Sequence, residues 1–388
     1  MSSAQEDLLG TVKSLSREVL KQHAADVDSR NRFPTESIEA LRQAGLFGFF
    51  VPNLFGGIEG NYSAFCRIAS ILGEECLSTA LIWVMHCSQV AVLADHAANT
   101  HADILTAIAH KGLLVASVTT EPKEGSDLLR VHSALVEAGA QFRVQRIAPV
   151  VSYGAEADLF LTTMRASASS PVNDVSLVLI MPQDGDVTVE GEWNAMGMRG
   201  TRSIAMKFDV FVDRDRVISK PFREVALQSM TPVAHMGWSA CWFGAARGAY
   251  KRFVTLARVM GSQGRQIDSD LFLSRLARMR VSLDLMEGIL THVVDRLDVM
   301  RQANAPFAQY ENSTHKILLN NLKVAVSELS FSVVNQLMEL AGLRSGYLVD
   351  ESLGLERVFR DLRSASLMYS NDRLLNANAK LVFMEGFS

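Results

Sequence analysis

The pattern of hydrophobic and polar positions divides the chain into three parts. Over residues 6–109, apolar residues recur at helical spacing, most clearly in 35–46 and 62–92. Over residues 113–217, short runs rich in Val, Thr, Phe and Leu are separated by Gly, Pro, Asp and Ser, a pattern that predicts strands and turns. The runs expected to form strands are 113–120, 158–163, 175–182 and 204–212.

Helical periodicity returns after about residue 225 and predicts long helices over 232–260, 268–303 and 314–341. Helices of this length usually pack as a bundle. Because helical and strand-forming segments are segregated along the chain, we expect an α+β fold and no alternating βαβ sheet. The expected domains are residues 1–112 (helical), 113–224 (strands) and 225–388 (helical).

Composition narrows the class of protein. The 388 residues are 48% hydrophobic and 21% charged, which is typical of a globular chain with a large core. With 38 basic and 42 acidic residues and no basic run, we expect no nucleic-acid partner. No stretch reaches about 18 uninterrupted apolar residues, so we expect no membrane span. The four cysteines form no C-x-x-C pair, so we expect free thiols. The N-terminus lacks the pattern of a secretory signal peptide, so we expect a cytoplasmic location.

Two polar, glycine-bearing segments carry the candidate chemistry. Residues 118–127 read VTTEPKEGSD and follow a predicted strand. Clustered hydroxyl and backbone N–H groups, with Gly125 allowing close approach, are suited to a flavin edge and a pyrophosphate. Residues 193–217, WNAMGMRGTRSIAMKFDVFVDRDRV, form a glycine-rich turn before an alternating strand. No G-x-G-x-x-G follows a strand, so a dinucleotide is not expected to bind in the Rossmann manner.

Together with Phe33-Pro34 and LRQAGLFGFFVPNLFGG (41–57), these segments resemble the acyl-CoA dehydrogenase family over nearly the whole chain. The matching family motifs are its F-P entry, its T-E-P-x-x-G-S-D loop and its L-G-M-R-G-T turn. The stretch RVFRDLRSASLMY (357–369) resembles the family's R-D-A-R segment. The resemblance implies an N-terminal α-helical domain, a middle β-barrel domain and a C-terminal four-helix bundle, with FAD as cofactor.

The resemblance also implies the residues that contact the flavin. In the T-E-P loop these are Val118, Thr119, Thr120, Gly125 and Ser126. The segment VVSYGAEADLF resembles the family's W-I-T-N-G-x-x-A sequence. This resemblance implies three further flavin contacts, which are Val150, Val151 and Ser152. Val150 replaces the family's usual Trp, and Ser152 would place a hydroxyl near flavin N5.

The candidate catalytic residues depart from the family pattern. Its dehydrogenases remove an α-proton with a Glu, but gapless alignment puts Tyr369 at that position, and one inserted residue would put Ser370 there. Asp372 would serve only if the loop were rebuilt. The alternative family position for the Glu, on a preceding helix, falls near Gly237. A Tyr or Ser is a poor base near neutral pH.

Further residues match family positions less closely. His86, in WVMHCSQ, matches a His that is common at this position of the family's corresponding helix. It is either a catalytic group or a histidine of the helical core. The family's contacts to the FAD of a neighbouring subunit would correspond to Arg258, Glu339 and Gly342. Here Glu339 replaces the usual Gln, which puts shared FAD contacts in question.

The resemblance and the missing Glu together predict an FAD-dependent oxidoreductase that acts on a CoA or carrier-protein thioester and uses molecular oxygen in specialised metabolism. One alternative is a dehydrogenase with a displaced base that passes electrons to an electron-transferring flavoprotein. Another is a catalytically silent flavin-binding or assembly protein. The resemblance implies a homodimer or homotetramer.

Overall fold

The N-terminal part of the chain consists of helices packed around one apolar helix. The structure is a computed structural model and describes residues 3–122, 128–262, 269–349 and 352–384. The helices here are α1 (Ser3–Leu15), α2 (Lys21–Ser29), α3 (Thr35–Gln43), α4 (Tyr62–Glu75), α5 (Leu77–His96) and α6 (Ala102–Lys111). Almost every residue of α5 from Leu77 to Leu93 is buried, so this helix forms the centre of the fold.

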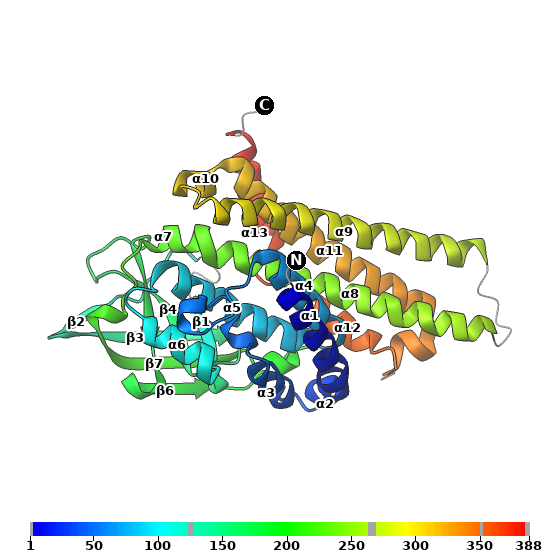
Figure 1. The fold of residues 1–388 in the computed structure, drawn as a ribbon, viewed down its shortest axis with the longest axis horizontal. Coiled ribbons are helices and arrows are strands. Elements are labelled where there is room, and N and C mark those ends of the chain that lie inside the picture. The colour runs from blue at the N-terminus through cyan, green and yellow to red at the C-terminus, as the bar shows by residue number, and fades with distance from the viewer. Residues whose placement is uncertain (1–2, 123–127, 263–268, 350–351, 385–388) are drawn as a thin grey trace.

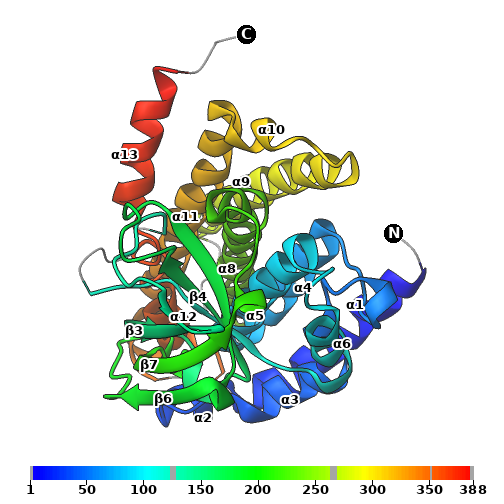
Figure 2. The same ribbon diagram turned by 90° about the vertical axis from the view of Figure 1, so that its left-hand side faces the viewer.

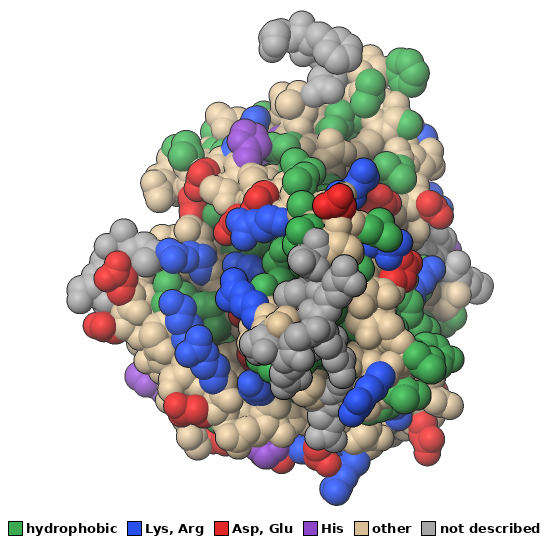
Figure 3. All heavy atoms as spheres, turned by 90° about the vertical axis from the view of Figure 1, so that its right-hand side faces the viewer, with side chains coloured by type: hydrophobic (Ala, Val, Ile, Leu, Met, Phe, Trp, Pro, Cys, Tyr) green, Lys and Arg blue, Asp and Glu red, His purple; other side chains and the backbone are tan. Residues whose placement is uncertain are grey.

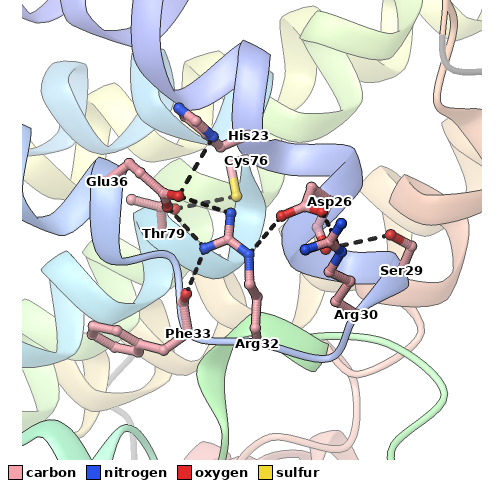
Figure 4. Close-up of polar contacts among 9 residues, drawn as sticks. All are labelled: His23, Asp26, Ser29, Arg30, Arg32, Phe33, Glu36, Cys76 and Thr79. Atoms are coloured by element: carbon pink, nitrogen blue, oxygen red, sulfur yellow. Dashed lines mark hydrogen bonds and ion pairs between the residues drawn. The ribbon is translucent and has the colours of Figure 1, made fainter.

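Arg32 connects α2 to α3 through two carboxylates (Figure 4). Its Nε donates to Asp26 at 2.6 Å, and its two terminal nitrogens donate to Glu36 at 2.8 and 3.0 Å. These bonds to Arg32 lower the pKa of Glu36. The forked guanidinium therefore fixes the turn between the two helices.

Two sheets form the middle of the chain. The first has the order β1-β4-β5, with β1 (Val115–Val118) parallel to β4 (Leu159–Arg165) and β5 (Val175–Ile180) antiparallel to it. The second is antiparallel in the order β2-β3-β7-β6, from β2 (Val136–Ala138), β3 (Gln141–Val151), β7 (Ile204–Asp213) and β6 (Gly185–Glu190). Phe160 and Phe208 meet edge to face at 5.2 Å and join the sheets.

Long helices form the C-terminal part and run side by side away from the sheets (Figures 1 and 2). They are α8 (Thr231–Ser262), α9 (Asp270–Gln302) and α11 (Ser313–Gly342), with the shorter α7 (Phe222–Val225), α10 (Phe307–Glu311), α12 (Leu355–Leu362) and α13 (Asn371–Val382). Helix α4 packs closely on α8, since a Cβ on Gly244 would lie 2.1 Å from the Ser70 carbonyl oxygen. The N- and C-terminal helices thus form one body.

The α+β fold with helical, sheet and helical regions is confirmed, and so are the predicted long helices and strands. Strand β3 was not among the predicted runs, because its sequence QFRVQRIAPVV places charged residues in a strand. One of these, Arg146, is buried in an ion pair with Glu121. The four cysteines are free and buried, as expected. The three domain boundaries remain predictions.

Two helices within the described residues are long and apolar enough to cross a membrane by length and composition, Leu77–His96 and Ser313–Tyr347. The first is the central core helix, so its apolar character serves packing. Charged side chains of both signs and hydrophobic side chains lie on the face at the ends of α8 and α9 (Figure 3). Left of the centre of this view, several Lys/Arg side chains lie close together, with few Asp/Glu side chains among them.

Candidate active site

Hydroxyl groups gather where three strands begin or end. Thr119 and Thr120 follow β1, and the Thr120 Oγ1 donates to the Val150 carbonyl oxygen at 3.0 Å, which ties the ends of β1 and β3 together. Ser152 follows β3 and shares a 2.9 Å hydrogen bond with Ser203, just before β7. The topology of the two sheets therefore brings distant polar residues to one place.

This hydroxyl row continues toward the glycine-rich turn. Ser203 shares a 2.8 Å hydrogen bond with the hydroxyl of Thr201, which donates in turn to the Met198 carbonyl oxygen at 2.8 Å. The turn is fixed from the other side by Asp361 of α12, whose carboxylate accepts from the Met198 backbone N–H. Complete burial raises the pKa of Asp361 to about 7. The turn is thus held by partners from both the sheet and the helices.

Two adjoining cavities open beside the hydroxyl row. The larger cavity, of about 410 Å³, lies between the glycine-rich turn and the segment after α12. The smaller cavity, of about 190 Å³, lies between α5, α8 and the same segment. Their shared lining residues are Met85, Thr119, Thr120, Val150, Ser152, Trp238 and Tyr369. Because these residues border both spaces, the cavities form one composite site.

Tyr369 lies at the junction of the two cavities in a left-handed backbone conformation, with φ of 48°. Such a conformation is strained for a residue with a large side chain and is often found at functional sites. Lys323 of α11 stabilises the segment between α12 and α13, which contains Tyr369. Its Nζ donates to the Ala365 carbonyl oxygen at 2.9 Å and to Asn371 Oδ1 at 2.7 Å. Burial lowers the pKa of Lys323 to about 8.

His235 of α8 lines the smaller cavity and was missed by the sequence analysis. It is 1% exposed, and its ring lies 5.7 Å from the rings of Tyr369 and Trp238. Burial, with a further contribution from Lys323, lowers the pKa of His235 to about 3, so the imidazole is neutral. The spacing of His235 and Trp238, three residues apart, places them on one helix face and was the available signal.

Five predicted residues come together at the cavities, namely Thr119, Thr120, Val150, Ser152 and Tyr369. Two others, Val118 and Val151, are completely buried in strands and are not among the described lining residues. Gly125 and Ser126 lie outside the described residues. The flavin roles of these positions remain predictions.

The other predicted catalytic residues lie elsewhere. Both ring nitrogens of His86 are engaged, since Nε2 contacts the Phe47 carbonyl oxygen at 2.9 Å and Nδ1 accepts from the Val115 N–H at 3.1 Å. Burial lowers the pKa of His86 to about 4, and this geometry favours the core-histidine interpretation. Ser370 is the N-cap of α13, and Asp372 is exposed in the first turn of that helix. None of the three is among the described residues that line the cavities.

The predicted subunit-sharing residues lie far along the helices. Arg258 is 20 residues beyond Trp238 on α8, about 30 Å along the helix axis. Glu339, near the end of α11, accepts from Asn335 at 3.2 Å and pairs with Arg275 at 3.7 Å. Gly342 ends that helix with a φ of 69°. None of the three is among the described residues that line the cavities, and their contact with the FAD of a neighbouring subunit remains a prediction.

Comparison with known proteins identifies the family. The model of the acyl-CoA dehydrogenase N-terminal domain matches residues 2–103, and that of the acyl-CoA dehydrogenase C-terminal domain matches residues 236–370. Together they cover more than half of the chain. The chain therefore belongs to the acyl-CoA dehydrogenase family.

Two curated relatives span nearly the full chain. A 3-sulfinopropanoyl-CoA desulfinase of Paraburkholderia xenovorans is 23% identical over 383 residues, covering 97% of this chain and 94% of the relative. The acyl-[acyl-carrier-protein] dehydrogenase MbtN of a Mycobacterium species is 27% identical over 377 residues, covering 95% and 90%. Their names describe different reactions, so family membership alone does not define the chemistry.

Solved structures share the fold. Butyryl-CoA dehydrogenase from Megasphaera elsdenii superposes with a TM-score of 0.87 at 15% identity, covering 99% of each chain. The dibenzothiophene monooxygenase TdsC from Paenibacillus sp. A11-2 superposes with a TM-score of 0.84 at 17% identity, covering 99% of this chain and 98% of the other. At these identities the likeness concerns the fold alone.

Proposed function

We propose that this chain is an FAD-dependent oxidoreductase that acts on an acyl thioester of CoA or an acyl carrier protein and uses molecular oxygen. The thioester part rests on the family and on relatives whose names specify CoA and acyl-carrier-protein substrates. The oxygen part rests on the lining of the cavities. The structural neighbour TdsC demonstrates that the same fold accommodates a monooxygenase.

The larger cavity suits a flavin. Its 410 Å³ is within the usual range of ligand pockets, about 300–1,000 Å³. One wall offers the hydroxyls of Thr119, Thr120 and Ser152 for the polar edge of the ring. Apolar surface for the ring face comes from Val150, 42% exposed, and Met196, 55% exposed. When bound, FAD would supply two-electron transfer between substrate and acceptor.

The observation that carries the proposal is the missing carboxylate. Among the described residues that line either cavity, none is Asp or Glu. Proton abstraction from a thioester α-carbon requires a base with a pKa near the working pH. The ionisable side chains among the described lining residues are two arginines, two phenols and one imidazole whose pKa is lowered to about 3, namely Arg360, Arg363, Tyr153, Tyr369 and His235. This lining favours chemistry that relies on an enclosed, water-poor site.

In this proposal the protein's own residues orient the reactants. Thr119, Thr120 and Ser152 bind the flavin edge, while Trp238 and Tyr369 border the space between flavin and acyl group. Oxygen would accept four electrons in total, two from an external reductant such as reduced nicotinamide or reduced flavin, delivered through the bound FAD, and two from the substrate C–H bond. One oxygen atom enters the product and the other leaves as water.

The second candidate is a dehydrogenase that passes electrons to an electron-transferring flavoprotein. The position of Tyr369 at the junction favours it as the base, whereas Asp372 is exposed and lies outside the described lining. A silent flavin-binding protein is the third candidate and predicts bound flavin that no thioester reduces.

Two anaerobic titrations with a panel of acyl-CoA thioesters separate the three, one of the oxidised, FAD-loaded protein and one of the chemically reduced protein, which then receives oxygen. We expect an oxygenated product that forms only after oxygen enters. An enoyl product formed without oxygen would establish the dehydrogenase, and Tyr369→Phe would then test the base. Oxidised flavin that no thioester reduces, together with reduced flavin that oxygen reoxidises without forming any organic product, would support the silent protein.

A further inference from the structure

Lys323 of α11 is a completely buried lysine. Its ammonium group donates to the Ala365 carbonyl oxygen at 2.9 Å and to Asn371 Oδ1 at 2.7 Å, and it lies 5.6 Å from the centre of the Trp242 ring. Neither hydrogen-bond partner carries a charge. Burying a charged group is unfavourable, so a lysine at this position indicates a role that an apolar residue of α11 could not fill.

The two oxygen atoms bound by Lys323 belong to residues on either side of Tyr369. Ala365 precedes Tyr369 in the turn after α12, and Asn371 follows it at the start of α13. One ammonium group therefore joins both ends of this turn to α11. Lys323, the Ala365 carbonyl group and the Asn371 side chain are called the Lys323 clamp below.

The Asn371 end of the Lys323 clamp is itself fixed to α11. Asn371 is buried, and its Nδ2 donates to Ser327 Oγ at 3.0 Å and to Glu328 Oε1 at 3.1 Å. Both polar atoms of the amide thus have partners on the helix that carries Lys323. Because breaking buried hydrogen bonds is unfavourable, the start of α13 is held in one place on α11.

The Lys323 clamp explains how Tyr369 keeps a strained backbone conformation. A left-handed φ of 48° persists at a residue with a large side chain only where the surrounding structure imposes it. The Tyr369 ring centre lies 5.7 Å from the His235 ring and 5.7 Å from the Arg373 guanidinium. The same turn supplies four described lining residues of the larger cavity, which are Ser364, Leu367, Met368 and Tyr369. The shape of the junction between the cavities therefore depends on this turn.

We infer that Lys323 is a positioning residue for the reaction and acts through Tyr369, which the Lys323 clamp holds at the junction of the two cavities. This inference rests on the proposed function, in which flavin and acyl group meet at that junction. A displacement of about 1 Å at a group that orients reactants can lower turnover about a hundredfold. Lys323 itself touches neither reactant.

Steady-state kinetics of the FAD-saturated protein test the role of Lys323. Lys323→Met keeps a side chain of similar length and removes the donors. We expect kcat to fall at least about tenfold and KM to change less than about threefold, because the other walls still bind the thioester. In a Tyr369→Ala background, Lys323→Met should change kcat less than about twofold, since the side chain that the clamp positions is absent.

Asn378→Leu is the matched control. The buried Asn378 also ties α13 to α11, through hydrogen bonds of 2.8 Å with Asn320 and 2.9 Å with Asn321. Its loss should lower the melting temperature and leave kcat unchanged. A similar fall of kcat in Asn378→Leu and Lys323→Met would mean general destabilisation and would overturn the inference. An undiminished effect of Lys323→Met in the Tyr369→Ala background would also overturn it.

The FAD dissociation constant of the apoprotein gives a second readout, which does not depend on turnover. Lys323→Met should weaken FAD binding several-fold, because the turn lines the larger cavity, and Asn378→Leu should not. An enoyl product would refute the oxygen-dependent function, but the ratios of kcat would still test Lys323. If the wild-type protein turns over no thioester, the proposed function fails, and equal FAD affinity of wild type and Lys323→Met overturns the inference as well. If Lys323→Met does not fold, Asn371→Ala opens one end of the clamp and should show the same changes.

Discussion

Replacing Asp361 by Asn should remove a pH dependence of stability that arises where α12 meets the glycine-rich turn. Complete burial raises the pKa of Asp361 from 3.8 to about 7. Because the folded-state pKa is higher than the unfolded one, this group's contribution to stability is fully present below pH 3.8. It is lost as the pH rises through 7. Asparagine carries no charge, and its Oδ1 can still accept from the Met198 N–H.

Linkage gives the size of the effect. With those two pKa values, the contribution of Asp361 to the free energy of unfolding falls by about 3 kcal/mol between pH 5 and pH 8. Other titrating groups act equally on both proteins and cancel in the difference. The stability of Asp361→Asn relative to wild type should therefore increase by about 3 kcal/mol over this range.

The assay is urea unfolding followed by tryptophan fluorescence at pH 5, 6, 7 and 8. Asp372→Asn makes the same change of charge at an exposed position and should show no such trend. If the stabilities of wild type and Asp361→Asn run parallel from pH 5 to pH 8, then Asp361 is ionised throughout and the reasoning from burial is refuted.

Three further substitutions test how the site is held. Glu121→Gln leaves Arg146 buried without its ion-pair partner and should lower the free energy of unfolding by about 3–5 kcal/mol. The control Asp209→Asn breaks the surface pair with Arg143 and should lower the free energy of unfolding by less than about 1 kcal/mol. Similar urea midpoints for the two variants would contradict this expectation. Gly197→Ala would put a Cβ 2.2 Å from the Arg360 carbonyl oxygen and should lower the melting temperature and weaken flavin binding, while Gly288→Ala, which has open space, should do neither. Lys323→Met removes the bonds to Ala365 and Asn371, so hydrogen exchange over residues 363–370 should become faster; unchanged exchange would mean that the segment does not depend on Lys323.

The sequence was sufficient for the fold and for five of the residues that line the cavities. Thr119 could be identified because it ends a predicted strand, whereas Ser152 was identified only through the resemblance of its segment to the acyl-CoA dehydrogenase family, since the strand that it follows was not predicted. Strand β3 was harder, since Arg146 interrupts its apolar pattern and is buried only through Glu121, a contact between distant segments.

The missed residues depend on packing that periodicity does not specify. A helical histidine such as His235 usually serves the core, and its role at the cavity emerges only when α8 faces α5 and the segment of Tyr369. The burial of Lys323 and Asp361 was equally inaccessible, because charged residues are rarely buried unless a partner is present. Their partners lie far away in the sequence, namely Ala365 and Asn371 for Lys323 and the Met198 backbone N–H for Asp361.

Isotope labelling tests the oxygen-dependent chemistry most directly. The FAD-loaded protein is reduced, mixed with a bound thioester under ¹⁸O₂ in ordinary water, and the product is analysed by mass spectrometry. The proposal predicts one ¹⁸O atom in the organic product and none when the label is in water instead. An unlabelled enoyl thioester, formed equally well without oxygen, would contradict it and identify the protein as a dehydrogenase.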